Sequence, residues 1–433
     1  MKIGVVGLWH LGEIAAAGLA ELGHRVIGVD ENPETIENLQ KGIPPLEEPG
    51  LRESIAKHLR AGTLSFTHDI KNLAQCESIF FTFDTPVTDA DEPDTSILFA
   101  AAKKIAPFLP AKILFVVMSQ VPVGTTKKLA AIIAGDDRAR KCEPVYFPEN
   151  LQLGKAMDCF LNADRFVIGA DSADGHDAVE LILAKSSSPR LHMKIASAEL
   201  SKHALNGYLG TSLSFIYNIA DLCEAHGGDI ADVTKALKSD SRIGPAAYLD
   251  ASIGFSGGTL MRDIKMLIGL SKEAKLVLPV IEGAAVTNET RRRRMIDRIE
   301  TLLGRTLFGA RVGILGATYK PGTATLRRSL ALEVASLLKA RGADVVAYDP
   351  AADSGELAGM LRASPCASPY EMASGCHAVV LLTAWPQFAE IDFALLKDKM
   401  KEPHLFFDTR NFFREREEEL TKLGFLYKGI GKA

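Results

Sequence analysis

Cysteine, tryptophan and excess charge are all scarce in this chain of 433 residues. Its six cysteines are scattered without a CxxC pair, so we expect reduced thiols, no disulfide framework and no bound metal. The formal net charge is -4, so the chain lacks the excess positive charge that binding to nucleic acid or an anionic membrane requires. No uninterrupted apolar run reaches about 18 residues, which excludes a membrane span. These absences predict a cytoplasmic protein that binds neither nucleic acid nor membrane.

One basic run interrupts this even distribution of charge. Residues 291–294 are four consecutive arginines near the end of a helical region. A solvated helix face is the favoured interpretation, and a site for phosphate or a partner is the alternative.

The order of apolar and helical patterns predicts an α/β protein with two Rossmann-like, doubly wound domains joined by a helical segment. Short apolar runs that read as buried parallel strands occur at 3–6, 25–29, 78–81 and 113–117, and again at 312–315, 344–348, 378–382 and 405–407. Helical patterns such as 13–22 separate them. Between the two sets, 198–226 contains almost no helix breaker and predicts one long helix. The predicted domains are 1–195, 196–300 and 301–433.

The first strand leads into a dinucleotide-binding pattern. The turn Gly7-Leu8-Trp9-His10-Leu11-Gly12 follows GxGxxG, except that Trp9 replaces the middle glycine. Gly7 permits a tight turn, Gly12 permits close packing, and the following helix N-terminus attracts a pyrophosphate. Trp9 is compatible with this site when its side chain points away and its amide faces the phosphate. Asp30, which ends the second strand 18 residues after Gly12, predicts NAD over NADP by binding a ribose hydroxyl. A helix cap is its alternative role.

A series of motifs, in a fixed order, runs through nearly the whole chain. They are GIPPLEEPGL at 42–51, VPVGT at 121–125, PENL at 148–151, AELSK at 198–202 with Asn206, SRIG at 241–244, GFSGGTLMRD at 254–263, YKPGT at 319–323 with Arg327, TAW at 383–385, and DTRN at 408–411. The series resembles the UDP-glucose/GDP-mannose dehydrogenase family. The resemblance implies an NAD-dependent enzyme that oxidises a nucleotide sugar.

The resemblance assigns hydride-transfer chemistry to three residues. In the family, a pair such as Lys202 and Asn206 stabilises the oxyanion at the oxidised carbon, and Asp263 positions the water or base. Because Lys202 and Asn206 are four residues apart, a helix places them on one face. An exposed helix lysine is the alternative interpretation of Lys202.

The departures from the family concern acyl chemistry. Thr259 stands where the family has the cysteine nucleophile, and a threonine hydroxyl cannot readily replace a thiol. Leu153 replaces a glutamate implicated in thioester hydrolysis, and Gln120 replaces a nearby threonine. Arg262 replaces a lysine. Cys159 is a candidate for a displaced nucleophile, although a small buried side chain is favoured.

The resemblance also implies binding residues around this centre. Cofactor contacts are expected at Gly7, Trp9, His10, Leu11, Gly12, Asp30, Thr85, Gln120, Arg262 and Arg327. Substrate contacts are expected at Glu149, Leu151, Lys202, Asn206, Arg242, Phe255, Gly257, Lys320 and Arg410. In the family the arginine at position 242 reaches the neighbouring subunit's site, which implies a homodimer or larger homo-oligomer. A surface ion pair is the alternative role for Arg327 and Arg410.

Taken together, these residues predict a nucleotide-sugar oxidoreductase that does not complete oxidation to the acid. The product is then a released aldehyde or ketone, or an isomer formed by re-reduction, as in a redox-neutral epimerase. One alternative is a full 6-dehydrogenase that oxidises the aldehyde hydrate directly. Another is a catalytically silent paralogue that binds the nucleotide sugar.

Overall fold

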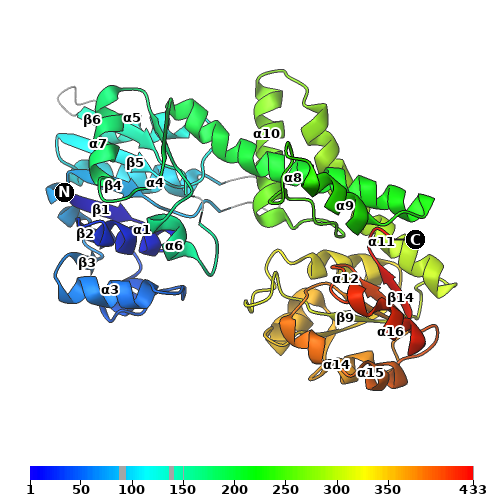
Figure 1. Ribbon diagram of the computed structural model, residues 1–433. Coiled ribbons are helices and arrows are strands. Elements are labelled where there is room, and N and C mark those ends of the chain that lie inside the picture. The colour runs from blue at the N-terminus through cyan, green and yellow to red at the C-terminus, as the bar shows by residue number, and fades with distance from the viewer. Residues whose placement is uncertain (87–93, 136–140, 150, 433) are drawn as a thin grey trace. The chain divides into compact units, whose positions relative to one another are not determined.

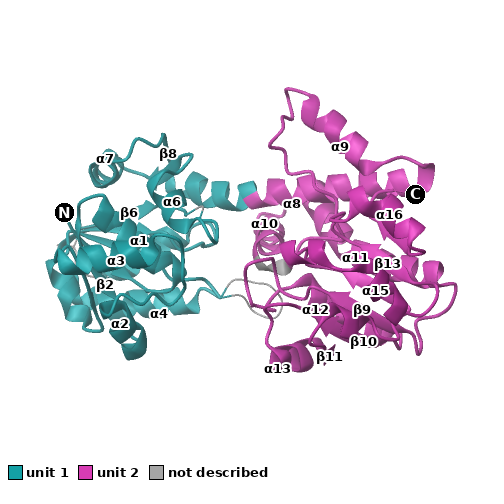
Figure 2. Cartoon of the chain, turned by 60° about the horizontal axis from the view of Figure 1, so that its bottom comes forward, with its two compact units in different colours: residues 1–205 teal, residues 206–433 magenta. Residues whose placement is uncertain are grey.

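The computed structural model describes residues 1–86, 94–135, 141–149 and 151–432. This part of the chain forms two compact units, residues 1–205 and 206–433, which Figure 2 shows in teal and magenta. The boundary falls inside a single long helix, α8 (Ile195–His226). The division into three domains stays a prediction from the sequence.

The first unit contains an eight-stranded sheet in the order β3-β2-β1-β4-β5-β6-β7-β8 (Figure 1). Its strands are β1 (Lys2–Val6), β2 (Arg25–Val29), β3 (Leu64–Thr67), β4 (Ser78–Phe81), β5 (Lys112–Val117), β6 (Lys141–Tyr146), β7 (Phe166–Ala170) and β8 (Arg190–Met193). All neighbours are parallel except β6 and β7. The central strands are buried on both faces, which explains their continuous apolar runs.

Helices cover this sheet, and their apolar residues form two cores. They are α1 (His10–Glu21), α2 (Pro33–Gln40), α3 (Leu51–Arg60), α4 (Ser96–Ile105), α5 (Thr125–Ala134), α6 (Ala156–Leu161) and α7 (Ala173–Ile182). α1 is rich in alanine and glycine, so it can pack closely, and ten of its residues are buried.

The second unit begins with helices and ends with a six-stranded parallel sheet in the order β11-β10-β9-β12-β13-β14. Its longer helices are the rest of α8, α9 (Ile230–Ser239), α10 (Arg262–Glu273), α11 (Pro279–Leu303) and α12 (Leu330–Ala340). Its strands are β9 (Arg311–Leu315), β10 (Asp344–Tyr348), β11 (Ser364–Pro365), β12 (Ala378–Leu381), β13 (Leu405–Asp408) and β14 (Leu426–Gly429), with the short helices α13 (Ser354–Glu356), α14 (Pro369–Ala373), α15 (Phe393–Lys399) and α16 (Glu417–Lys422). One continuous core joins the helical segment to this sheet.

The predicted fold class is confirmed, and each predicted strand and the long helix are present within a few residues. The interpretation of 291–294 as a solvated helix face is wrong for two of its four arginines. Arg291 and Arg292 are buried in α11. Arg291 is held by Asp221 and backbone carbonyls, and Arg292 forms an ion pair with Glu333 at 2.7 Å. Packing against α8 and α12, which a run of arginines does not reveal, buries them.

The two sheets share one local feature: an aspartate after one strand binds the backbone amides of the turn that follows the neighbouring strand. In the first unit, Asp30 follows β2 and accepts a hydrogen bond from the Leu8 amide, in the turn after β1. In the second, Asp349 follows β10 and accepts from the amides of Ala317 and Thr318, in the turn after β9. Each turn begins with a glycine at positive φ, Gly7 or Gly316. The two α/β sheets therefore share this hydrogen-bonded turn although their sequences show no recognisable repeat.

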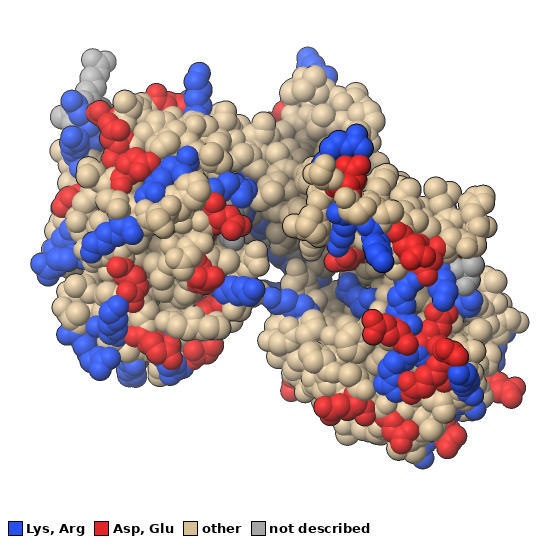
Figure 3. Space-filling model, in the orientation of Figure 1, with Lys and Arg blue, Asp and Glu red and all other residues tan. Residues whose placement is uncertain are grey.

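The surface carries both signs of charge. On the faces visible in Figure 3, lysine and arginine alternate with aspartate and glutamate over each unit. Among the described residues, no helix combines the length and apolar character needed to cross a bilayer.

Candidate functional site

The turn after β1 has the geometry of a dinucleotide site. Gly7 has φ +93, a conformation that side chains other than glycine rarely adopt. A Cβ at Gly12 would lie 1.8 Å from the Gly7 carbonyl oxygen, so only glycine fits there. The Trp9 side chain is 52% exposed and does not cap the first amides of α1. The N-terminus of α1 is thus open to a pyrophosphate, and the residues present fit NAD.

The other predicted residues of this unit lie on the same edge of the sheet. Leu11 is buried, and His10 contacts the Glu48 carboxylate at 3.0 Å. Thr85, after β4, donates to the carbonyl of Gln120, after β5, at 2.6 Å. The ends of β1, β2, β4 and β5 are neighbours in the sheet order, which is where doubly wound folds bind ligands.

Asp30 binds backbone amides on both sides of it and is not the cap of α2, so the helix-cap alternative is wrong. Its carboxylate accepts from the Leu8 amide at 2.8 Å and from the Asn32 amide at 2.9 Å. Asn32, in turn, caps α2. Asp30 therefore fixes the turn around Gly7, and its contact with a ribose stays a prediction.

Glu13, in the first turn of α1 and next to Gly12, is a buried carboxyl group that the sequence analysis did not single out. It is fully buried, and neither carboxylate oxygen has a hydrogen-bond partner in good geometry, although the Leu46 backbone lies near them. Burial, with the negative charges of Glu48 and Glu47 nearby, raises its pKa to about 9, and the backbone of Leu46 offsets only part of this. Glu13 is therefore a neutral acid at pH 7. The only signal in the sequence is a glutamate among the small apolar residues of 14–20.

Lys202 and Glu149 meet at the end of the first unit. The Lys202 ammonium donates to the Glu149 backbone oxygen at 2.5 Å and lies 3.4 Å from its carboxylate. Only 9% of the Lys202 side chain is exposed, so the exposed-lysine interpretation is wrong. The Leu151 amide donates to the Glu149 carboxylate within the loop, and the bond from Lys202 joins that loop to α8.

Asn206 and Asp263 form the second predicted pair. Asn206 lies one turn beyond Lys202 on α8, as the spacing predicts. Its amide group donates to the Asp263 carboxylate at 2.5 Å, and both residues are buried. Asp263 lies in the first turn of α10, directly after a π-helical turn at Gly257–Met261 that contains Thr259. Asp263 and Thr259 therefore lie on one continuous helical segment.

A cavity of about 500 Å³ opens within the second unit. Four residues predicted for the substrate or catalytic site line it: Phe255, Thr259, Lys320 and Arg410. Sequence reasoning missed several others on its wall, namely Tyr217, Tyr248, Ser252 and Tyr319. Only the tertiary packing of α8 against the loops at 248–256 and 319–320 brings these residues together.

The remaining predicted residues lie elsewhere in the second unit. Arg242 is 87% exposed and is paired with Asp240 in the turn after α9. Arg262 begins α10, and Arg327 is exposed beside Thr325. Gly257 begins the π-helical turn. The cofactor roles of Arg262 and Arg327 and the substrate roles of Arg242 and Gly257 stay predictions.

The cysteines are all free thiols, and Cys159 is half-buried in α6. Within the described ranges, no group of histidine, cysteine, aspartate and glutamate has the arrangement of a metal site.

Three segments of the chain match the domains of one protein family. Residues 1–186, 196–290 and 313–415 match the NAD binding, central and UDP binding domains of the UDP-glucose/GDP-mannose dehydrogenase family. The UDP-glucose 6-dehydrogenase of Rhizobium meliloti is 34% identical over 441 residues, covering 100% of both chains. UDP-glucose 6-dehydrogenase TuaD of Bacillus subtilis is 32% identical, covering 100% of this chain and 93% of that protein.

A solved structure extends the comparison to the fold. The UDP-glucose dehydrogenase of Pyrobaculum islandicum aligns with a TM-score of 0.88 and 30% identity, covering 100% of this chain and 98% of that one. Together with the open N-terminus of α1, these matches define an NAD-dependent oxidoreductase. The chain belongs to the UDP-glucose/GDP-mannose dehydrogenase family.

Replacing Glu13 by glutamine should change how stability depends on pH. The folded protein keeps the Glu13 proton up to a pKa of about 9, whereas a solvated glutamate has a pKa of 4.5. Between these values the folded state binds more protons, so this group makes the unfolding free energy fall as pH rises, by up to about 1.4 kcal/mol per pH unit. Urea unfolding at pH 5 to 8 should show a flatter profile for Glu13→Gln.

The exposed Glu34 on α2 provides the control, and Glu34→Gln should leave the profile unchanged. Parallel profiles for wild type and Glu13→Gln would show that Glu13 ionises normally in the folded protein.

Proposed function

We propose that this protein oxidises an alcohol carbon of a nucleotide sugar, C6 of a UDP-hexose, to the carbonyl level without completing oxidation to the acid. The observation that carries the proposal is the side chain at position 259, where a hydroxyl and not a thiol reaches the cavity wall. The contacts of Lys202, Asn206 and Asp263 are meanwhile intact. Random loss of function would have damaged both sets of residues alike.

Oxidation of an alcohol requires a place for the hydroxyl proton and a positive environment for the oxygen. NAD, when bound, supplies the hydride acceptor. The Lys202 ammonium, with little exposure, supplies the positive charge. The Asn206 amide group has a second N–H for the developing oxyanion while it holds Asp263. Asp263, fully buried, is the group to which the proton is relayed.

The alternatives differ in the step that comes after the first oxidation. Re-reduction from the opposite face gives a redox-neutral epimerase, and direct oxidation of the aldehyde hydrate gives a full 6-dehydrogenase with Asp263 as base. The silent paralogue is the weakest alternative, because the outward Trp9 side chain leaves the N-terminus of α1 open.

Product stoichiometry separates these outcomes. The purified protein is incubated with NAD and a panel of UDP- and GDP-sugars, and NADH absorbance and product mass are recorded over time. One NADH per sugar with an aldehyde is expected. Two NADH with an acid would overturn the proposal, an isomer without net NADH selects the epimerase, and absence of binding selects the silent paralogue.

Thr259→Cys should create a covalent trap. A thiolate at this position can add to the carbonyl product, and a second oxidation by NAD then gives a thioester on the protein. Because Leu153 replaces the glutamate implicated in hydrolysis, we expect the thioester to accumulate. Intact-protein mass spectrometry should show an added nucleotide-sugar acyl group.

Thr259→Ser, which keeps a hydroxyl, is the matched control and should show no adduct. Turnover to acid by Thr259→Cys alone would contradict the assigned role of position 153.

We infer that the protein is a homodimer in which Arg242 completes the partner's site. Two observations support this: Arg242 is almost fully exposed, and α8 exposes Tyr208, Phe215 and Leu222 at a spacing of seven residues, along one face.

Mixed dimers test this arrangement. Arg242→Ala and Lys202→Ala should each be inactive, because each lacks one residue of the site. Co-refolding equal amounts should restore about one quarter of wild-type activity, since half of the dimers then contain one complete site. No recovery, with a dimer confirmed by sedimentation, would place Arg242 outside the partner's site.

A further inference from the structure

Tyr217, on α8, presents an unused hydroxyl to the cavity of the second unit. The residue is 1% exposed, yet it lines the cavity with Thr259 and Arg410. The Tyr217 backbone carbonyl accepts a hydrogen bond from Arg291, and the Arg291 guanidinium carbon lies 5.0 Å from the centre of the Tyr217 ring. The ring also stacks on Phe255, with 6.4 Å between the ring centres. Within the described residues, no group accepts from or donates to its phenol oxygen. Because Tyr217 lines the cavity, a ligand bound there would give this hydroxyl a hydrogen-bond partner.

Arg410, which lines the same cavity as Tyr217, is a half-buried cation that forms no ion pair with a carboxylate among the described residues. Its guanidinium donates to the Leu382 carbonyl at 2.7 Å and to the Ser252 hydroxyl at 3.2 Å, both uncharged acceptors. In the part of the chain that the structure describes, no carboxylate forms an ion pair with it. The Asp408 oxygens are taken by the amides of Arg410 and Phe413 and by the Tyr427 hydroxyl.

The charge of the cavity wall favours an anion. Lys320 and Arg410 line it, and the only acidic residue on the described wall is Asp250. The Asp250 side chain is mostly exposed and pairs with Lys238 at 3.3 Å. Burial lowers the pKa of Arg410, and a bound anion would oppose that effect.

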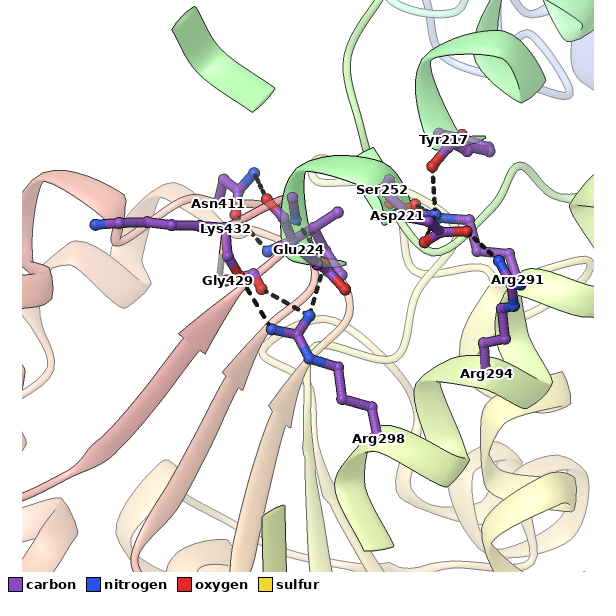
Figure 4. A network of polar contacts seen from close by, with 12 residues as sticks. Tyr217, Asp221, Glu224, Ser252, Arg291, Arg294, Arg298, Asn411, Gly429 and Lys432 are labelled. Atoms are coloured by element: carbon purple, nitrogen blue, oxygen red, sulfur yellow. Dashed lines mark hydrogen bonds and ion pairs between the residues drawn. The ribbon is translucent and has the colours of Figure 1, made fainter. Parts of the chain in front are cut away.

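Arg291 on α11 holds Tyr217 in place. Arg291 donates to the Tyr217 carbonyl at 2.7 Å, to the Ser252 carbonyl and to the Asp221 carboxylate at 2.5 Å (Figure 4). Because Ser252 also accepts from Arg410, Arg291 fixes the two partners relative to each other. Burial raises the pKa of Tyr217, so at neutral pH its phenol is an O–H donor.

We propose that the Tyr217 hydroxyl and the Arg410 guanidinium together bind the diphosphate of the nucleotide sugar, with Tyr217 as a specificity-determining residue of the site. The diphosphate supplies both the missing counterion and the missing hydrogen-bond acceptor. This inference rests on the proposed function for the source of the anion.

Tyr217→Phe tests the inference, because it removes the hydroxyl and keeps the ring. Calorimetric titration with UDP should show a dissociation constant raised about tenfold, the effect of one charge-assisted hydrogen bond. Titration with uridine, which has no phosphate, should be unaffected. Without ligand, the melting temperature should stay the same or rise, because no protein hydrogen bond is lost.

Tyr348→Phe is the matched control. Tyr348 lies on β10 in the same unit, outside the cavity lining, and its variant should bind UDP as wild type does. Unchanged UDP affinity in Tyr217→Phe, or an equal loss with uridine, would overturn the inference alone. A loss seen with UDP-glucose and not with UDP would assign the hydroxyl to the sugar and overturn the diphosphate contact. Failure of wild type to bind UDP would overturn the nucleotide-sugar assignment itself, and with it the source of the anion.

Discussion

The guanidinium of Arg291, buried between α8 and α11, is the interaction on which the second unit depends. A buried cation is tolerated only when oxygens surround it, and here the Asp221 carboxylate and the carbonyls of Tyr217 and Ser252 do so. Those three groups come from a helix and a loop far apart in sequence. Satisfying one charge therefore fixes where α8, α11 and the loop at 252 lie, and with them the cavity wall.

Arg410, which also contacts Ser252, shows the opposite arrangement. Its partners are a carbonyl and a hydroxyl, so its charge is solvated but not neutralised. Proteins keep such incomplete sites where a ligand completes them. The same contrast separates Thr259 from the pair Asn206 and Asp263: the pair is joined by a hydrogen bond, whereas Thr259 faces the cavity, at the position where the resemblance leads us to expect a cysteine.

Most of the fold could be predicted because it depends on local pattern. Strands buried on both faces have uninterrupted apolar runs, and α8 contains no breaker. Two of the strands that were missed lack that signal, because β6 contains Pro144 and β8 has no fully buried residue. β7 was missed although all five of its residues are apolar or small and buried. The resemblance predicted Phe255, Lys320 and Arg410, which share one cavity wall. Tyr217, Glu13 and the burial of Arg291 could not be predicted, because each depends on what packs against a helix and not on the helix's own sequence.

The placement of the two tryptophans has a consequence for optical measurements. Trp9, in the first unit, is largely in solvent, whereas Trp385, in the second, is buried, and its indole N–H donates to Thr318 and Asp349. The chain contains no other tryptophan. Each unit thus carries one intrinsic fluorophore, and the two differ in polarity of environment. Emission near the wavelength of hydrated indole reports on Trp9, in the turn after β1. Emission near that of buried indole reports on Trp385, beside the second sheet. One fluorescence spectrum can therefore follow changes in each unit separately.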